Sequence, residues 1–164
     1  MECFSYLQPM QDEDLSWVLA LEQRSYDFPW SLRGFEKSLE QGLNYLFYDT
    51  KGQKLGYCCI LPVLDEAHIL NVCVARKYQG KGIATAALKK ILTKLSLNGY
   101  QIALLEVRES NSPAIKLYQS LGFQQDGLRK NYYRTKVWDA FKEQLVEGRE
   151  NAVLMSFSLT DLAK

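Results

Sequence analysis

The sequence predicts a mixed α/β fold, with antiparallel strands in its N-terminal half and a parallel β-α-β crossover near its centre. The crossover is predicted from an apolar run at 67–75, two glycines, a helical pattern at 83–97 and a second apolar run at 101–108. Two strands that are joined through a helix are expected to be parallel. The antiparallel part is predicted from strands at 44–49 and 54–63, which flank the turn Thr50-Lys51-Gly52.

Helices and short strands are predicted on both sides of this crossover. A strand at 3–7 precedes a helix at 12–26, in which apolar residues recur at near-helical spacing. Ser31 is expected to cap a second helix, which Gly42 ends. A further helix is expected from Ser112, as its cap, to Leu121.

The C-terminal region is predicted to hold two closing strands, at 123–134 and 151–159. Residues 135–147 lie between them and are predicted to form a helical insertion. The prediction depends on Val137, Phe141 and Leu145, which follow one another at intervals of four and would share one face of an amphipathic helix.

Length and composition indicate a single domain, 1–164, and exclude several classes of function. A net charge of +1 argues against general binding to nucleic acid or to an anionic membrane. No apolar run is long enough to span a bilayer, and the start of the sequence lacks the cationic segment of a secretory signal. The four cysteines form no Cys-x-x-Cys pair and there is one histidine, so no metal site is expected. A cytoplasmic protein is predicted, and its oligomeric state is left open.

The glycines at 80 and 82 follow a strand and precede a helix, which is an arrangement that suits a phosphate. Backbone N–H groups can approach a ligand closely there, and the helix N-terminus favours negative charge. A Walker loop is excluded because its Gly-x-x-x-x-Gly-Lys-Ser/Thr spacing is absent. A dinucleotide-binding fingerprint is matched only in part, because Thr85 stands where its third glycine or alanine belongs.

Two motifs resemble the GNAT family of acetyl-CoA-dependent N-acetyltransferases. The family's Gln/Arg-x-x-Gly-x-Gly/Ala motif is matched by residues 79–84. Gln79, Gly82 and Ala84 occupy its three specified positions. A second element, Asn-x-x-Ala-x-x-Leu-Tyr followed by Gly-Phe, is matched by Asn111, Ala114, Leu117, Tyr118, Gly122 and Phe123. The resemblance covers nearly the whole chain in the order of that family, whose fold holds acetyl-CoA between splayed parallel strands.

Within the family, the sequence is most similar to the RimI type, which acetylates the N-terminal alanine of the eighteenth small-subunit ribosomal protein. The similarity lies in 28–31, 105–108, 131–133 and 148–152. It implies that the N-terminus of a ribosomal protein is the acceptor. The segment 135–147 departs from the usual shorter connection, close to where acceptor specificity would be decided.

The resemblance also implies which residues bind acetyl-CoA. Backbone groups of the apolar strand would hold the pantetheine arm, with an N–H near Val74 polarising the thioester carbonyl. The loop would cradle the pyrophosphate. The residues implied are Val72, Cys73, Val74, Gln79, Gly80, Lys81, Gly82, Ile83, Ala84 and Thr85, with Asn111 on the pantetheine. The strand residues are equally well explained as a buried apolar strand.

Glu106 is the candidate general base for direct attack of the amine on the thioester. It interrupts an apolar strand, where an unpaired carboxylate is costly. Partial burial would raise its pKa towards the range in which it accepts a proton. The alternative is a glutamate that faces solvent or pairs with Arg108 on the same face of the strand.

Tyr118 is the candidate general acid, which would protonate the departing thiolate. It follows Asn111 by seven residues and so returns to nearly the same face of a helix. A tyrosine is protonated at neutral pH and can donate. The alternative is an aromatic residue that only packs.

The sequence is also compatible with two other functions. The chain would be an acetyltransferase of a small amine, such as a polyamine, an aminoglycoside or an amino acid, or a non-catalytic acetyl-CoA-binding module. For the acceptor groove, the candidates are 27–31, 129–133 and the inserted segment. Tyr132 and Tyr133 alternate in a predicted strand, so one of the two is expected to face the groove.

Overall fold

The computed structural model describes residues 3–163, which divide into two compact units. The first contains residues up to 104 together with those from 158 onward, and the second contains 105–157. The strand order is β1-β2-β3-β4-β5 in the first unit and β5-β7-β6 in the second, because β5 (Ile102–Arg108) passes from one unit into the other. The predicted single domain stays a prediction.

The first four strands of the first unit pair with one another in antiparallel order. The pairings join β1 (Tyr6–Pro9), β2 (Leu43–Tyr48), β3 (Lys54–Val63) and β4 (Glu66–Val74) in succession. The predicted hairpin around the turn at 50–52 is therefore confirmed. Asp49 fixes this turn, since its Oδ1 accepts hydrogen bonds from the backbone N–H groups of Lys51 and Gln53.

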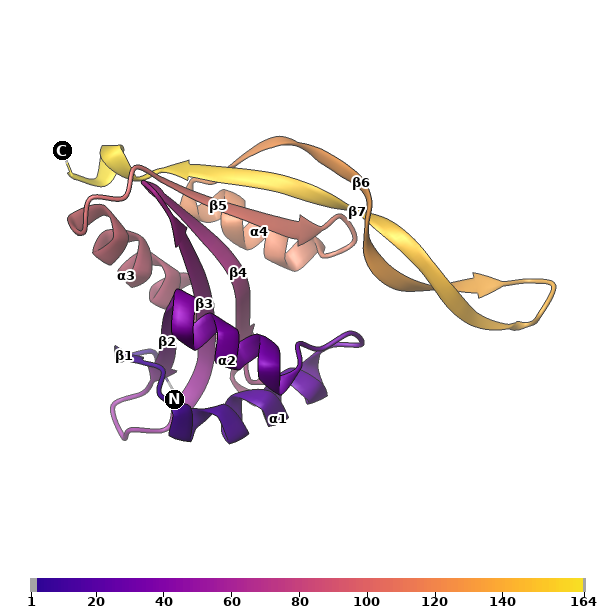
Figure 1. Ribbon diagram of the computed structural model, residues 1–164, viewed down its shortest axis with the longest axis horizontal. Coiled ribbons are helices and arrows are strands. Elements are labelled where there is room, and N and C mark those ends of the chain that lie inside the picture. Colours follow the sequence, from indigo (N-terminus) through magenta and orange to yellow (C-terminus); the bar gives the residue numbers. More distant parts are fainter. Residues whose placement is uncertain (1–2, 164) are drawn as a thin grey trace. The chain divides into compact units, whose positions relative to one another are not determined.

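The helices of the first unit cover this sheet with apolar side chains. A short 3-10 helix, η1 (Asp12–Asp14), leads into α1 (Leu15–Ser25), and α2 (Leu32–Gln41) packs on β2 and β3 (Figure 1). Ser31 caps α2, as predicted, with its side chain accepting from the Gly34 N–H. The largest fully buried apolar side chains of this unit are Tyr57, Phe35, Phe47, Leu46, Leu55, Ile60, Leu88, Ile91, Leu95 and Leu159.

The predicted β-α-β element is present, with α3 (Ile83–Leu97) connecting the neighbouring strands β4 and β5. A 3-10 turn, η2 (Arg76–Tyr78), follows β4, and η3 (Leu159–Ala163) packs against α3. Residues 87, 88, 91, 92 and 95 form the buried face of α3. Their spacing is that of one helical stripe, which explains why the helix bounds agree with the prediction.

The second unit contains α4 (Ser112–Leu121) and a long antiparallel hairpin of β6 (Gln124–Asp139) and β7 (Gln144–Ser158). Asn111, not Ser112, caps α4: its Oδ1 accepts from the Ala114 N–H at 3.2 Å, so that prediction was one residue off. Gly122 ends the helix at a φ of 110°, in the left-handed region that glycine adopts at least cost.

The predicted helical insertion at 135–147 is wrong, because this segment forms the outer part of the β6–β7 hairpin (Figure 1). Val137 pairs with Val146 across the two strands and Trp138 pairs with Leu145. The turn between the strands is built by Asp139, whose Oδ1 accepts from the N–H groups of residues 141 and 142. A spacing of four residues fits a strand period of two as well as a helical period of 3.6, so it did not distinguish the two structures.

No helix within residues 3–163 is both long enough and apolar enough to cross a membrane.

Candidate active site

The glycine loop of the first unit has the geometry of an anion-binding helix start. Gly80 and Gly82 both have a φ of 76°, and Gly82 is the N-cap of α3. A Cβ built on either glycine would meet no atom within 4 Å, so these positions are glycine because of backbone conformation and leave open space above the loop. The first N–H groups of α3 have no partner within the helix. The loop therefore fits a phosphate-bearing ligand.

Gln79 ties this loop to the end of β4. Its Nε2 donates to the Val74 carbonyl at 2.9 Å, so the side chain holds the loop in place as well as beginning the motif. Lys81 lies with its Nζ 6.0 Å from the centre of the Tyr78 ring. Residues 83–85 form the first turn of α3, where their N–H groups point towards the loop.

Cys73 is buried, which bears on whether it is a nucleophile. Burial raises the pKa of its thiol, although a hydrogen bond with Ser25 acts in the opposite direction. A thiol with a raised pKa is a poor source of thiolate at neutral pH. A buried thiol of this kind does not favour an acyl-enzyme intermediate on Cys73.

A buried carboxylate in the first unit was missed in the sequence. Glu22 of α1 is 2% exposed and accepts hydrogen bonds from the Tyr57 hydroxyl, the Asn71 amide and the Trp30 N–H. A signal for it existed: Glu22 follows Val18 by four residues and so lies on the apolar face of the helix.

Glu106 lies on β5 in the second unit and forms an ion pair with Arg129 of β6, with 3.1 Å between Oε1 and Nη2. The expected alternative partner, Arg108, pairs instead with Glu150. The Glu106 side chain is 29% exposed, so it is partly buried but still reachable from solvent. An acid at this position can hold a cation and can accept a proton.

Both tyrosines of the segment 131–133 lie close to these charges, which corrects the prediction of simple alternation. The strand register shifts between Arg129 and Tyr133, and Asn131 has a φ of 51°. The ring centres of Tyr132 and Tyr133 are consequently only 5.0 Å apart. Burial, followed by the charge of Glu106, raises the pKa of Tyr132 and raises that of Tyr133 to about 12.

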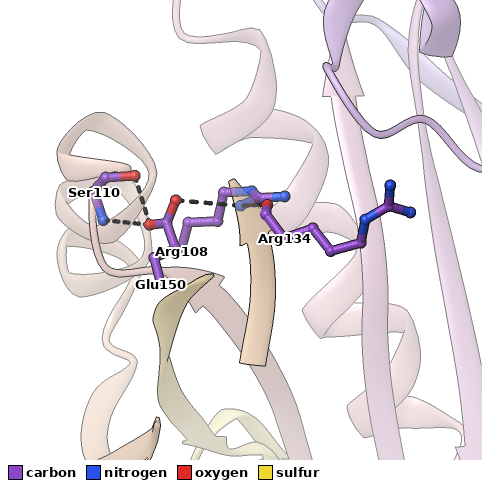
Figure 2. A network of polar contacts seen from close by, with 4 residues as sticks. All are labelled: Arg108, Ser110, Arg134 and Glu150. Atoms are coloured by element: carbon purple, nitrogen blue, oxygen red, sulfur yellow. Dashed lines mark hydrogen bonds and ion pairs between the residues drawn. The ribbon is translucent and has the colours of Figure 1, made fainter. Parts of the chain in front are cut away.

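A polar network holds the turn that follows β5 (Figure 2). Arg108 Nη1 donates to the Arg134 carbonyl at 2.7 Å and to Glu150 Oε2 at 3.2 Å. The other oxygen of Glu150 accepts from the Ser110 hydroxyl and N–H. Burial alone would raise the pKa of Glu150, but these hydrogen bonds outweigh it and lower the pKa. The network fixes the backbone between Glu106 and Asn111.

Asn111 precedes α4 as its cap, and Tyr118 lies within the helix. The Oδ1 of Asn111 is used by the helix cap, which leaves Nδ2 as the part of the side chain suited to a ligand's acceptor. Tyr118 is 9% exposed, and its ring packs edge-on against Phe123 with 5.7 Å between ring centres. The packing explanation for Tyr118 therefore holds for its ring.

Comparison with known proteins identifies the class of enzyme. The family model described as the acetyltransferase (GNAT) family matches residues 7–123, and the chain belongs to this family. It is accordingly an N-acetyltransferase with the GNAT fold, and the donor used by that family is acetyl-CoA.

Two bacterial relatives are similar along nearly their whole length. The chain is 34% identical over 156 residues to the ribosomal protein bS18-alanine N-acetyltransferase of Escherichia coli, covering 94% of this chain and 97% of that one. It is also 34% identical over 154 residues to the enzyme of that name from Haemophilus influenzae, covering 93% and 97%. The crystal structure of the Escherichia coli enzyme superimposes with a TM-score of 0.81 over 94% of this chain and 93% of that chain.

Proposed function

We propose that this protein transfers the acetyl group of acetyl-CoA to the α-amine of the N-terminal alanine of ribosomal protein bS18. The observation that carries the proposal is the similarity to the Escherichia coli enzyme of that activity, 34% identical along 94% of this chain. Similarity that extends along nearly the whole of both chains supports a shared acceptor. A cytoplasmic location belongs to the same proposal.

The glycine loop and the strand before it are assigned to the donor. Acetyl-CoA would supply the thioester and a pyrophosphate. Gly80, Gly82 and the first turn of α3 would hold that pyrophosphate, because their N–H groups and the positive end of the helix favour an anion. The backbone of Val72, Cys73 and Val74 would hold the pantetheine arm, and Gln79 would keep the loop against β4.

Glu106 is assigned the removal of a proton from the incoming ammonium. An α-amine has an unperturbed pKa of about 7.7–8.0, so a carboxylate within reach, directly or through a water, is sufficient. The neighbouring Arg129 fits this role, because it balances the charge of Glu106 until a second cation, the acceptor, arrives. The neutral amine would then form the new C–N bond as the C–S bond breaks.

Tyr118 is assigned the return of a proton to the departing thiolate, so that the reaction ends with a free thiol. Its hydroxyl is protonated at neutral pH. Contact between its ring and Phe123 would hold the hydroxyl in a fixed direction. The Nδ2 of Asn111 would donate to the pantetheine arm while Oδ1 caps α4.

The test is mass spectrometry of peptides that have been incubated with the protein and acetyl-CoA. The panel would contain a peptide with the N-terminal sequence of bS18, the same peptide with a blocked α-amine, and a mixture of small amines. We expect one acetyl group on the free peptide, located at its N-terminus, and none on the blocked copy.

Acetylation of the blocked peptide would move the reaction to a lysine side chain and would contradict the proposal. Acetylation of small amines alone would replace the acceptor but keep the enzyme class. No acetylation of any compound, despite tight binding of acetyl-CoA, would favour a non-catalytic module.

A further inference from the structure

The loop between α1 and α2, residues 26–31, is attached to the sheet of the first unit through a buried carboxylate. We propose that this carboxylate, Glu22, is a positioning residue that fixes the loop for binding of the acceptor. The inference rests on the proposed function, since it assigns to this loop a share in recognising the amine.

Glu22 gathers three hydrogen bonds from three different segments of the chain. Its Oε1 accepts from the Tyr57 hydroxyl on β3 at 2.5 Å and from Asn71 Nδ2 on β4 at 2.9 Å. Its Oε2 accepts from the backbone N–H of Trp30, in the loop, at 2.9 Å. The side chain is 2% exposed, and none of the three donors carries a charge. A buried carboxylate is stable only when its oxygens are bonded in this way.

The same residues close a ring of contacts around the loop. The Trp30 ring packs on Phe35 with 5.2 Å between centres, and Phe35 packs edge-on against Tyr57 at 5.8 Å. Because Tyr57 in turn bonds to Glu22, both the backbone and the side chain of Trp30 are held by one connected set. Replacement of any one of these residues is therefore expected to increase the mobility of the whole loop and not only to remove one contact.

A second attachment joins the start of the loop to the strand assigned to the donor. The Tyr26 hydroxyl donates to the Val72 carbonyl at 2.8 Å, and the Cys73 thiol lies 3.4 Å from the Ser25 hydroxyl. Residues 26–31 are exposed or half-buried, so they offer side chains to a ligand beside β4. A rigid loop at this place would select the acceptor without contacting the donor loop at 79–85.

An apolar side chain at position 22 would fill the same space but would accept no hydrogen bond from the Trp30 N–H. The carboxylate of Glu22 therefore orders the loop, which an apolar side chain of the same size would not do. A purely stabilising role would lower the melting temperature and leave the order of the folded loop and the kinetic constants unchanged. The positioning role and the purely stabilising role therefore predict different behaviour of the loop in the folded variants Glu22→Gln and Tyr57→Phe.

The first measurement is hydrogen exchange of backbone amides in the full chain. An amide at position 22 can accept through only one of its two polar atoms, so Glu22→Gln removes at least one of the bonds. Tyr57→Phe removes only a hydroxyl and is the second variant should Glu22→Gln fail to fold. We expect the backbone amides of residues 26–28, 30 and 31 to exchange about tenfold faster in both variants, as for loss of one hydrogen bond to a charged group. The amides of α2 at 36–41 are expected to be unchanged.

The second measurement is the kinetics of acetyl transfer to the bS18 peptide. The KM for the peptide is expected to rise about tenfold in both variants, while the dissociation constant for acetyl-CoA stays within about twofold of that of the unaltered protein. Glu36→Gln, an exposed glutamate on α2, is the matched control and should change neither value.

Unchanged exchange in the loop of both folded variants would overturn the inference. So would an equal rise in the constants for peptide and acetyl-CoA. If the unaltered protein does not acetylate the peptide, the proposed function fails, and the exchange experiment still decides separately whether Glu22 orders the loop.

Discussion

At the scale of the residue, two glutamates stand in apolar stretches and differ in what surrounds them. Glu22 is enclosed, and its oxygens are bonded to three uncharged donors. Glu106 keeps 29% of its side chain exposed and pairs with Arg129, whose own side chain is 52% exposed. A proton acceptor has to be reached by its substrate, whereas a positioning residue has to be satisfied internally. Glu106 therefore suits catalysis and Glu22 suits positioning.

Replacement of the proposed base is expected to separate chemistry from binding. Glu106→Gln should lower kcat by about 100-fold or more, since a positioned general base contributes at least that factor. Binding of acetyl-CoA, measured by calorimetry, should be unchanged because the residues assigned to the donor are intact. Loss of the folded state, seen by circular dichroism, would instead support a structural role for Glu106.

A second glutamate of the same unit provides the control. Glu147 forms an ion pair with Arg134 at 2.7 Å, but its side chain is 57% exposed. Glu147→Gln also breaks a pair between a glutamate and an arginine, and exposed pairs contribute little to stability. Near-normal kcat in this variant would show that loss of an ion pair is not what slows Glu106→Gln, and an equal fall in both would contradict the base assignment.

At the scale of the element, Asn111 caps α4 with its Oδ1 and is also assigned a contact with the pantetheine arm through its Nδ2. Asn111→Ala removes both the cap and the amide, and is expected to destabilise the protein by about 1 kcal/mol. Asn111→Ser keeps a capping oxygen but has no Nδ2. Its melting temperature should stay near that of the unaltered protein while acetyl-CoA binds more weakly, as titration calorimetry would measure. Unchanged affinity in Asn111→Ser would leave Asn111 as a cap only.

The elements also differ in how far the sequence could predict them. The bounds of α3 were predicted because its buried stripe repeats over four turns and a glycine stands at its start. The hairpin at 135–147 was not, since Val137, Phe141 and Leu145 satisfy two periods at once. Thr135, Val137 and Val146 are β-branched and favour strands, which was the local evidence against a helix. Phe141 turned out to be fully exposed in the turn.

The candidate site was predictable only where a role belongs to a local motif. The glycine loop, Glu106 and Tyr118 were assigned in this way, and their roles stay proposals. The ring through Glu22, Trp30, Phe35 and Tyr57 could not, because its members are up to 35 residues apart and meet only in the folded unit. The register shift between Arg129 and Tyr133 was also missed, since Asn131 combines a positive φ with a hydrogen bond to Asn151, a residue 20 positions away.

At the scale of the whole molecule, the chain and its relatives correspond almost from end to end. The alignment leaves only 3% of the Escherichia coli enzyme uncovered, and the structural match extends over 93% of that chain. Membership of the family indicates acetyl-CoA as the acetyl donor. The acceptor is proposed from the activity of the two bacterial relatives. A net charge of +1 provides no strong overall field to attract a substrate, so recognition has to come from local contacts.

The most direct test of this account is the intact mass of full-length ribosomal protein bS18, purified without its N-terminal acetyl group and incubated with the protein and acetyl-CoA. We expect a single added acetyl group, which fragmentation locates on the N-terminal alanine, and almost none with Glu106→Gln in the same time. An unmodified bS18, or acetyl groups on its lysine side chains instead, would contradict the assignment of the acceptor.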